Sequence, residues 1–192
     1  EAIAEITGGN NRVKYYTSTG YYRENSLLKV GNSADNYTSR LFVRGNIDMN
    51  LRDFLKVQAD ANVTFYDAFT AAGDWWSNAA SLRPDRVSPL IPLSYLEEND
   101  LLSGAAINAS NYIIGGKYFL GGTQLNPTNP IADSYAAGSS KFVSRQFQFN
   151  TVFDFNLKSV LQGLHFRAKY GIDYALTYNQ GYTNEHATFA PT

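Results

Sequence analysis

The chain contains no cysteine, which excludes a disulfide framework and a thiolate metal site. It also lacks a long hydrophobic run, because no window approaches the roughly 18 uncharged apolar residues that a membrane-spanning helix needs. Its 16 basic and 17 acidic residues give a formal charge of -1, so it has no basic field with which to hold nucleic acid. These absences leave a soluble domain or a membrane barrel as the classes to consider.

The first residues, Glu1-Ala2-Ile3, do not have the pattern of a secretory signal peptide. A membrane barrel needs such a signal for export. If the chain is part of a barrel, we therefore expect it to be a piece of a longer protein.

Two runs of strict alternation between Arg40 and Tyr66 are the strongest pattern in the 192 residues. Side chains of a strand point to opposite faces with a period of two, so the alternation predicts two strands with one apolar and one hydrated face. The apolar face carries Leu41, Val43, Ile47, Met49, Leu55, Val57, Ala59, Ala61, Val63 and Phe65. The other, mostly polar face carries Arg40, Phe42, Arg44, Asn46, Asp48, Lys56, Gln58, Asp60, Asn62, Thr64 and Tyr66.

A second long hairpin is predicted near the end of the chain. Alternation resumes at Phe142, sharpens from Gln146 to Leu157, and returns after a short turn from Leu164 to Tyr178. Its apolar face carries Phe147, Phe149, Phe153, Phe155, Phe166, Ile172, Tyr174 and Leu176. This hairpin is long like the first, whose strands exceed the roughly 9 to 11 residues that cross a bilayer, whereas soluble strands usually have about 5 to 6.

The expected connections alternate in length. The turns at 8–11, 50–53 and 158–163 are short, and the connections at 24–36 and 67–140 are long. Short turns at one rim and long loops at the other are typical of outer-membrane barrels. The predicted fold is all-β: an antiparallel up-and-down transmembrane β-barrel, of which residues 1–192 supply about six strands and one long extracellular loop.

The long loop carries few regular patterns. A short helix is expected from Asp74 to Leu82, and Pro89 and Pro92 favour extended chain after it. Two pairs of glycines bracket a possible small hairpin at 117–120, and turn chemistry is expected at 126–130.

Several short motifs resemble one membrane family. They are Ile6-Thr7-Gly8-Gly9-Asn10, Tyr15-Tyr16-Thr17-Ser18-Thr19-Gly20-Tyr21, Arg40-Leu41 with Asn46, and Asn129-Pro130-Ile131-Ala132 ahead of the strand that contains Arg145. Together they resemble the barrel strands of the SusC/RagA family of TonB-dependent transporters in the bacterial outer membrane.

The resemblance implies a barrel of about 22 strands closed by an internal plug. Such a barrel imports oligosaccharides or peptides that a SusD-like surface lipoprotein captures. TonB would energise it through parts of the protein outside this chain, and lipid would surround it. The resemblance implies no cofactor.

Candidate site residues are few. The histidines His165 and His186 have no spacing typical of a catalytic triad or a metal site, so we expect neither an enzyme nor a metal site. An acidic group at 97–100 is more typical of a solvated turn than of a cation site. Trp75 and Trp76, the only tryptophans, are the candidate ligand-binding residues, because adjacent aromatic rings can stack on a sugar or peptide. They could equally anchor the long loop.

Face matching restricts the register of both hairpins, since a slip of one residue turns every side chain over. In the first hairpin we expect a five-residue loop at 50–54, which places Arg44 opposite Asp60 and Asp48 opposite Lys56. In the second, opposing Leu157 with Leu164 pairs Asp154 with Arg167, and a slip of two pairs it with Lys169 instead.

The alternative to a transporter is a soluble β-rich surface binding module. In that class the same apolar faces pack sheet on sheet. A requirement for detergent separates the two.

Overall fold

The computed structural model describes residues 1–73, 80, 88–96, 101–110, 112–123 and 129–190. This described part is mostly antiparallel β-sheet, as predicted. The chain divides into two compact units. The sheet unit comprises Glu1–Glu24, Thr38–Ala68 and Phe142–Tyr178, and the loop unit comprises Asn25–Tyr37, Phe69–Lys141 and Asn179–Thr192.

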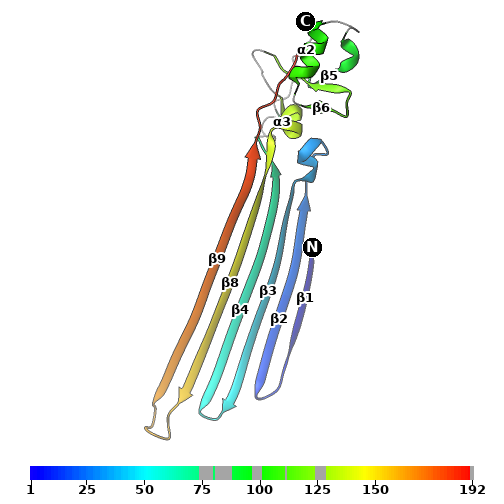
Figure 1. The fold of residues 1–192 in the computed structure, drawn as a ribbon. Coiled ribbons are helices and arrows are strands. Elements are labelled where there is room, and N and C mark those ends of the chain that lie inside the picture. Colours follow the sequence, from blue (N-terminus) through cyan, green and yellow to red (C-terminus); the bar gives the residue numbers. More distant parts are fainter. Residues whose placement is uncertain (74–79, 81–87, 97–100, 111, 124–128, 191–192) are drawn as a thin grey trace. The chain divides into compact units, whose positions relative to one another are not determined.

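Six long strands form the main sheet, in the order β1-β2-β3-β4-β8-β9 (Figure 1). Strands that follow one another in the sheet therefore also follow one another along the chain, apart from the insertion between β4 and β8. Within the described residues β1 and β9 are the two edges of the sheet and do not pair with each other. The strands are β1 (Ala2–Gly9), β2 (Val13–Asn25), β3 (Tyr37–Arg52), β4 (Leu55–Ala71), β8 (Gly138–Asn156) and β9 (His165–Thr183).

Three short turns lie together at one end of the sheet, here called the turn end (Figure 1). They span 10–12, 53–54 and 157–164. In the first, the Asn10 side-chain oxygen accepts hydrogen bonds from the backbone N–H groups of Arg12 and Val13 at 2.8 and 2.9 Å, so Asn10 closes the turn itself. The remaining connections, 26–36 and 72–137, are long. The predicted alternation of short and long connections is confirmed, and the long loop starts and ends inside the predicted 67–140.

Tyrosine occurs at both alternating positions of β2, with Tyr15 and Tyr21 on one face and Tyr16 and Tyr22 on the other, so the sequence leaves its facing open. The contact made by Gly20 decides it. A Cβ atom at Gly20 would collide with the ring of Phe42 on β3. Gly20 and Phe42 therefore share the polar face, and no larger residue fits beneath the ring. Tyr16 lies on the same face, where its hydroxyl donates to the Glu5 carboxylate of β1 at 2.7 Å.

The register of β8 and β9 matches the first predicted alternative. The backbone N–H of Leu157 donates to the Leu164 carbonyl at 3.0 Å. Further along the strands, Arg167 holds Asp154 in a bidentate ion pair, with its closest N–O distance 2.6 Å. The alternative with Lys169 opposite Asp154 is wrong.

The central hairpin differs from the prediction in its turn. β3 continues through Arg52 and β4 begins at Leu55, so only Asp53 and Phe54 lie between the strands and the predicted five-residue loop is wrong. The shorter turn brings different partners together across the polar face.

Two hydrogen bonds identify those partners. Asp60 accepts from the Asn46 side chain, and Asp48 accepts from Gln58 at 3.0 Å. Asp60 therefore contacts Asn46 in place of the predicted Arg44, and Asp48 contacts Gln58 in place of the predicted Lys56. Each partner lies two residues from the predicted position. A displacement by two preserves the predicted facing, because all four residues still share the polar face.

The loop unit has a small sheet and core of its own. Its strands are short and lie in the order β5-β7-β6, with Ile91 opposite Phe119 and Ile113 also opposite Phe119. Leu120, Ala132 and Ala136 form the buried core of this unit. Its elements are the 3-10 helices η1 (Gly31–Asp35) and η2 (Leu93–Tyr95), the strands β5 (Leu90–Pro92), β6 (Ile113–Ile114) and β7 (Tyr118–Leu120), and the helices α2 (Leu101–Ala109) and α3 (Pro130–Ala136).

The predictions for this region are confirmed only in part. Extended chain at Pro92 is confirmed. The small hairpin expected at 117–120 is wrong in its bounds, because residues 118–120 form the single strand β7, which pairs with β6 across a turn that contains the glycine pair 115–116 at positive φ. The turn expected at 126–130 is wrong where it is described, because Asn129 caps α3 and Pro130 is its first residue. Except for Ala80, the helix expected from Asp74 to Leu82 lies outside the described residues.

Paired cysteines test the corrected register of the central hairpin, with no background from other cysteines. Asn46→Cys with Asp60→Cys is expected to form a disulfide more completely than Arg44→Cys with Asp60→Cys. The reason is that a disulfide needs Cβ atoms about 3.5–4.5 Å apart, and Asp60 contacts Asn46. The measurement is gel mobility after mild oxidation. More complete oxidation of the 44/60 pair would reinstate the register predicted from sequence.

Removing the cap of α3 is expected to destabilise the loop unit. The Asn129 side chain accepts from the N–H groups of Ile131 and Ala132 and donates to the carbonyl of Gly121. Asn129→Ala should therefore cost about 1 to 2 kcal/mol and speed hydrogen exchange in α3. Asn129→Asp keeps the acceptor and should exchange more slowly than the alanine variant. Unchanged exchange in both variants would show that the cap is dispensable.

Candidate functional site

The polar face of the sheet unit carries a continuous set of cross-strand contacts. On β4 and β8, the Asn62 amide donates to the Gln148 side chain at 3.4 Å, and Asn156 N–H donates to the Phe54 carbonyl at 2.8 Å. Both contacts correspond to one antiparallel register, which places Lys56 of β4 opposite Asp154 of β8. Asp154 in turn faces Arg167 of β9.

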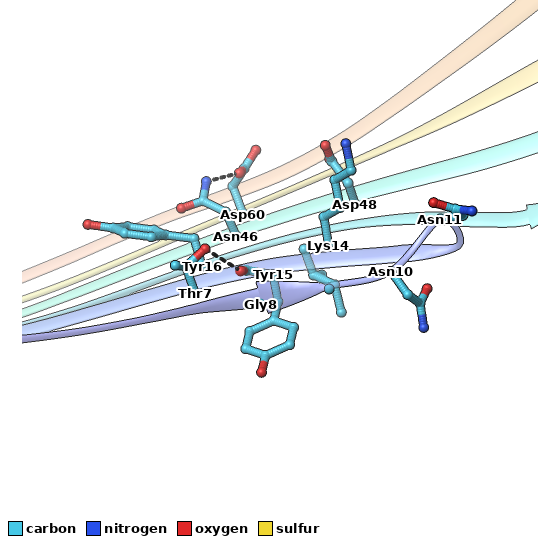
Figure 2. Close-up of a pocket in the computed structure, with 12 residues that line it drawn as sticks. Thr7, Gly8, Asn10, Asn11, Lys14, Tyr15, Tyr16, Asn46, Asp48 and Asp60 are labelled. Carbon is cyan, nitrogen blue, oxygen red and sulfur yellow. Dashed lines mark hydrogen bonds between the residues drawn. The ribbon is translucent and has the colours of Figure 1, made fainter.

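The first pocket on this face lies over β1, β2 and β3, and we call it the β1–β3 pocket (Figure 2). Its volume is about 710 Å3. Figure 2 shows Tyr16, Asn46, Asp48 and Asp60 projecting to one side of the strands, whereas Tyr15 projects to the other. The polar residues that line it are Thr7, Asn10, Asn11, Lys14, Tyr16, Asn46, Asp48 and Asp60.

The chemistry of the β1–β3 pocket suits the uncharged polar groups of a solute. The amide of Asn46 and the ammonium group of Lys14 are donors, and the carboxylates of Asp48 and Asp60 are acceptors. A solute rich in hydroxyl or amide groups can exchange hydrogen bonds with such a mixed set, and the ring of Tyr16 adds a flat surface for packing. The side chains come from neighbouring strands, so the sheet itself fixes their spacing.

The second pocket lies at the turn end, where β3, β4, β8 and β9 and the β1–β2 turn contribute to its lining, and we call it the turn-end pocket. Its volume is about 760 Å3. The Arg167–Asp154 ion pair lies at one side, and Lys56 and His165 are near enough to act electrostatically on the Asp154 carboxylate. The lining residues are Asn11, Arg12, Asn50, Leu51, Arg52, Asp53, Phe54, Leu55, Lys56, Asp154, Phe155, Asn156 and His165.

The opposite face of the sheet unit is apolar and exposed. Phe166 and Tyr170 of β9 expose 54% and 57% of their surface, far more than core aromatics do. Contiguous exposed apolar surface of this kind marks a face that contacts a membrane or a partner. Other exposed members are Ile6, Tyr15, Leu41, Val43, Phe65, Phe147, Phe153, Ile172, Tyr174, Leu176 and Tyr178.

One ion pair interrupts this apolar face. Arg145 and Asp67 have the facing of Phe147 and Phe65, and the Arg145 guanidinium binds both carboxylate oxygens of Asp67 at 2.9 and 3.2 Å. The guanidinium also donates to the Tyr66 carbonyl and lies 5.4 Å from the centre of the Phe65 ring. The Arg145 guanidinium and the Asp67 carboxylate thus neutralise each other, and protein groups accept several of the guanidinium's hydrogen bonds.

Only some of the candidate site residues from the sequence lie in the described part of the structure. Trp75, Trp76 and the acidic group at 97–100 lie outside the described residues, so the structure does not place them. His165 lines the turn-end pocket. His186 belongs to the loop unit, where its Nε2 atom lies 3.8 Å from Asp133 Oδ1.

Sequence reasoning did not single out the pocket residues as sites. Lys14, Tyr16 and Arg12 lie in or before a strand whose facing the sequence left open. Asn46, Asp48, Asp60 and Lys56 did appear on the predicted polar face. The sequence signal for these residues is therefore the alternation. It identifies a polar face, and that face is a candidate binding surface as well as a hydrated one.

In the described part of the chain, no group of three or more His, Asp or Glu side chains could hold a metal ion. No helix among the described residues is long and apolar enough to cross a membrane. Comparison of the chain with protein-family models, curated proteins and solved structures finds no match.

Proposed function

We propose that this chain forms part of the wall of a transmembrane β-barrel in the bacterial outer membrane. The barrel would belong to a TonB-dependent transporter like those of the SusC/RagA family, and it would import oligosaccharides or peptides. The observation that carries the proposal is the sheet unit's exposed apolar face opposite a polar face that holds two pockets.

Strand length supports a membrane location. β4 has 17 residues, and β8 and β9 have 19 each. Crossing a bilayer requires about 9–11 tilted residues, so each of these strands is long enough to cross and to extend beyond it. Strands of soluble domains average about 5–6 residues.

The two faces support transport rather than a purely structural wall. Lipid would contact the apolar face, and the polar face would line an aqueous interior, the division expected of a transmembrane barrel. A solute moving along the interior would meet the amides and carboxylates of the β1–β3 pocket. Many weak hydrogen bonds of this type let a solute bind and also leave.

The connections support an orientation. In outer-membrane barrels the short turns face the periplasm and the long loops face outward. The turn end would then be periplasmic, and the connection 72–137 would be extracellular. A SusD-like surface lipoprotein and the tryptophans Trp75 and Trp76 would act at that outer side, and TonB would act through parts of the protein outside this chain.

Fractionation and a pair of arginine substitutions test the membrane location. The full-length protein should require detergent for extraction. Ile172→Arg, at the middle of the apolar row of β9, should lower the yield of folded protein, since an arginine at the bilayer midplane costs about 2 to 4 kcal/mol. Ala175→Arg, on the polar face of the same strand, should have little effect. The readout is the fraction that keeps its folded mobility in a gel run without heating.

Extraction without detergent would favour the soluble surface-binding module instead. Equal yields of the Ile172→Arg and Ala175→Arg proteins would also contradict lipid contact, because they would show that both faces tolerate charge alike.

The tryptophan pair tests solute capture. Replacing Trp75 and Trp76 together by alanine is expected to weaken binding of the transported solute roughly tenfold, since buried aromatic anchors contribute most of the binding energy at such sites. Assembly should be unaffected. A matched control is Tyr118→Ala, an exposed aromatic of the same connection. Reduced membrane assembly with unchanged affinity would make the pair structural.

A further inference from the structure

The turn-end pocket has an excess of positive charge, although the whole chain has a formal charge of -1. Three permanent cations line it, Arg12, Arg52 and Lys56, against the two carboxylates of Asp53 and Asp154. Arg167 lies beside the pocket as a fourth cation. The β1–β3 pocket, by contrast, is lined by one lysine and two aspartates.

Contacts within the pocket increase this imbalance. Arg167 binds Asp154 through Nε at 3.2 and 3.1 Å and through Nη2 at 2.6 Å, so it occupies both carboxylate oxygens. Lys56 lies across from the same carboxylate on β4 and acts on it only through charge. Asp154 is therefore committed to Arg167 and leaves the ammonium group of Lys56 unneutralised.

The remaining cations are also available. Among the residues that the structure describes, no ion pair holds the side chains of Arg12, Arg52 or Lys56. They reach the pocket from the β1–β2 turn, the end of β3 and the start of β4, so three different segments contribute one cation each. His165 of β9 and the amide of Asn156 complete the rim with further donors.

We propose that the turn-end pocket binds carboxylate groups of the transported solute, and that this solute is therefore acidic. This inference rests on the proposed transport function and adds the class of its substrate. Guanidinium and ammonium groups around one pocket are the donors that bind carboxylates most strongly. Asp53 and Asp154 moderate the excess charge, so singly charged carboxylates fit better than a doubly charged phosphate.

A carboxylate of this kind could belong to an acidic oligosaccharide or to an acidic peptide. Both share the chemistry that the pocket recognises. The sources are separated by using one probe of each type with its neutral counterpart: trigalacturonate against maltotriose, and triglutamate against triglutamine.

The test is calorimetric titration of the full-length protein in detergent at pH 8. At least one acidic probe is expected to bind about tenfold or more tightly than its neutral counterpart, because each charge-assisted hydrogen bond contributes strongly to affinity. Raising the salt concentration should reduce the difference. Equal affinity for acidic and neutral probes would overturn the proposal, as would competition by equimolar inorganic phosphate.

Substitutions assign the effect to this pocket. Lys56→Gln combined with Arg12→Gln is expected to abolish most of the preference for the acidic probe and to leave the neutral probe unaffected. Lys56→Arg keeps the charge and should retain the preference. Lys169→Gln is the matched control, because Lys169 has the same facing on β9 but lies outside the pocket.

A loss of preference in Lys169→Gln equal to that of the double variant would show a general charge effect and overturn the site. Folded mobility in unheated gels verifies that each variant is assembled. Failure of this proposal would leave the detergent requirement and the Ile172→Arg result unchanged. The substrate class and the transport function can thus fail separately.

Discussion

Every side chain of a β-strand can point in only one of two directions, and the six-stranded sheet assigns a different chemistry to each. The rule holds across strands as well as along them, because antiparallel partners must match face to face. The hydrogen bonds Asn46–Asp60 and Asn62–Gln148 and the Asp154–Arg167 ion pair all lie on the same side as a result. Both pockets and the exposed apolar face follow from this one constraint.

The exception to the division shows how strict it is. Arg145 and Asp67 have the facing of the apolar rows, although both side chains are charged. They meet in a bidentate pair, and the guanidinium also contacts the Phe65 ring and the Tyr66 carbonyl. These two charges are held on this face together with their hydrogen bonds.

The long strands could be predicted from sequence because their alternation extends over many residues. The two hairpins and the facing of β3, β4, β8 and β9 were all within reach of parity arguments, which also limited the partner of Asp154 to Arg167 or Lys169. The register of β3 and β4 was not, because slips of two residues preserve every facing. The length of the turn decides the register of β3 and β4, because Asp53 and Phe54 suffice to reverse the chain. Parity limits a register but does not choose it.

The loop unit and the pockets were harder to foresee. Its strands have two or three residues each, too few for a period to appear, and Asn129-Pro130 is compatible with both a turn and a helix start. β2 carries tyrosine on both faces, so its orientation depends on the contact between Gly20 and Phe42, which no local pattern reveals. Pockets formed by side chains from three or four strands depend on all of these registers together.

The outer edge of β9 has a physical consequence of its own. In the described part of the chain β9 pairs only with β8, so one whole side of its 19-residue backbone presents donors and acceptors to the surroundings. Such an edge is a template for any other extended chain, and its neighbouring face is rich in aromatic residues. Produced by itself, residues 1–192 would therefore tend to pair this edge with strands from other copies and grow into extended sheets.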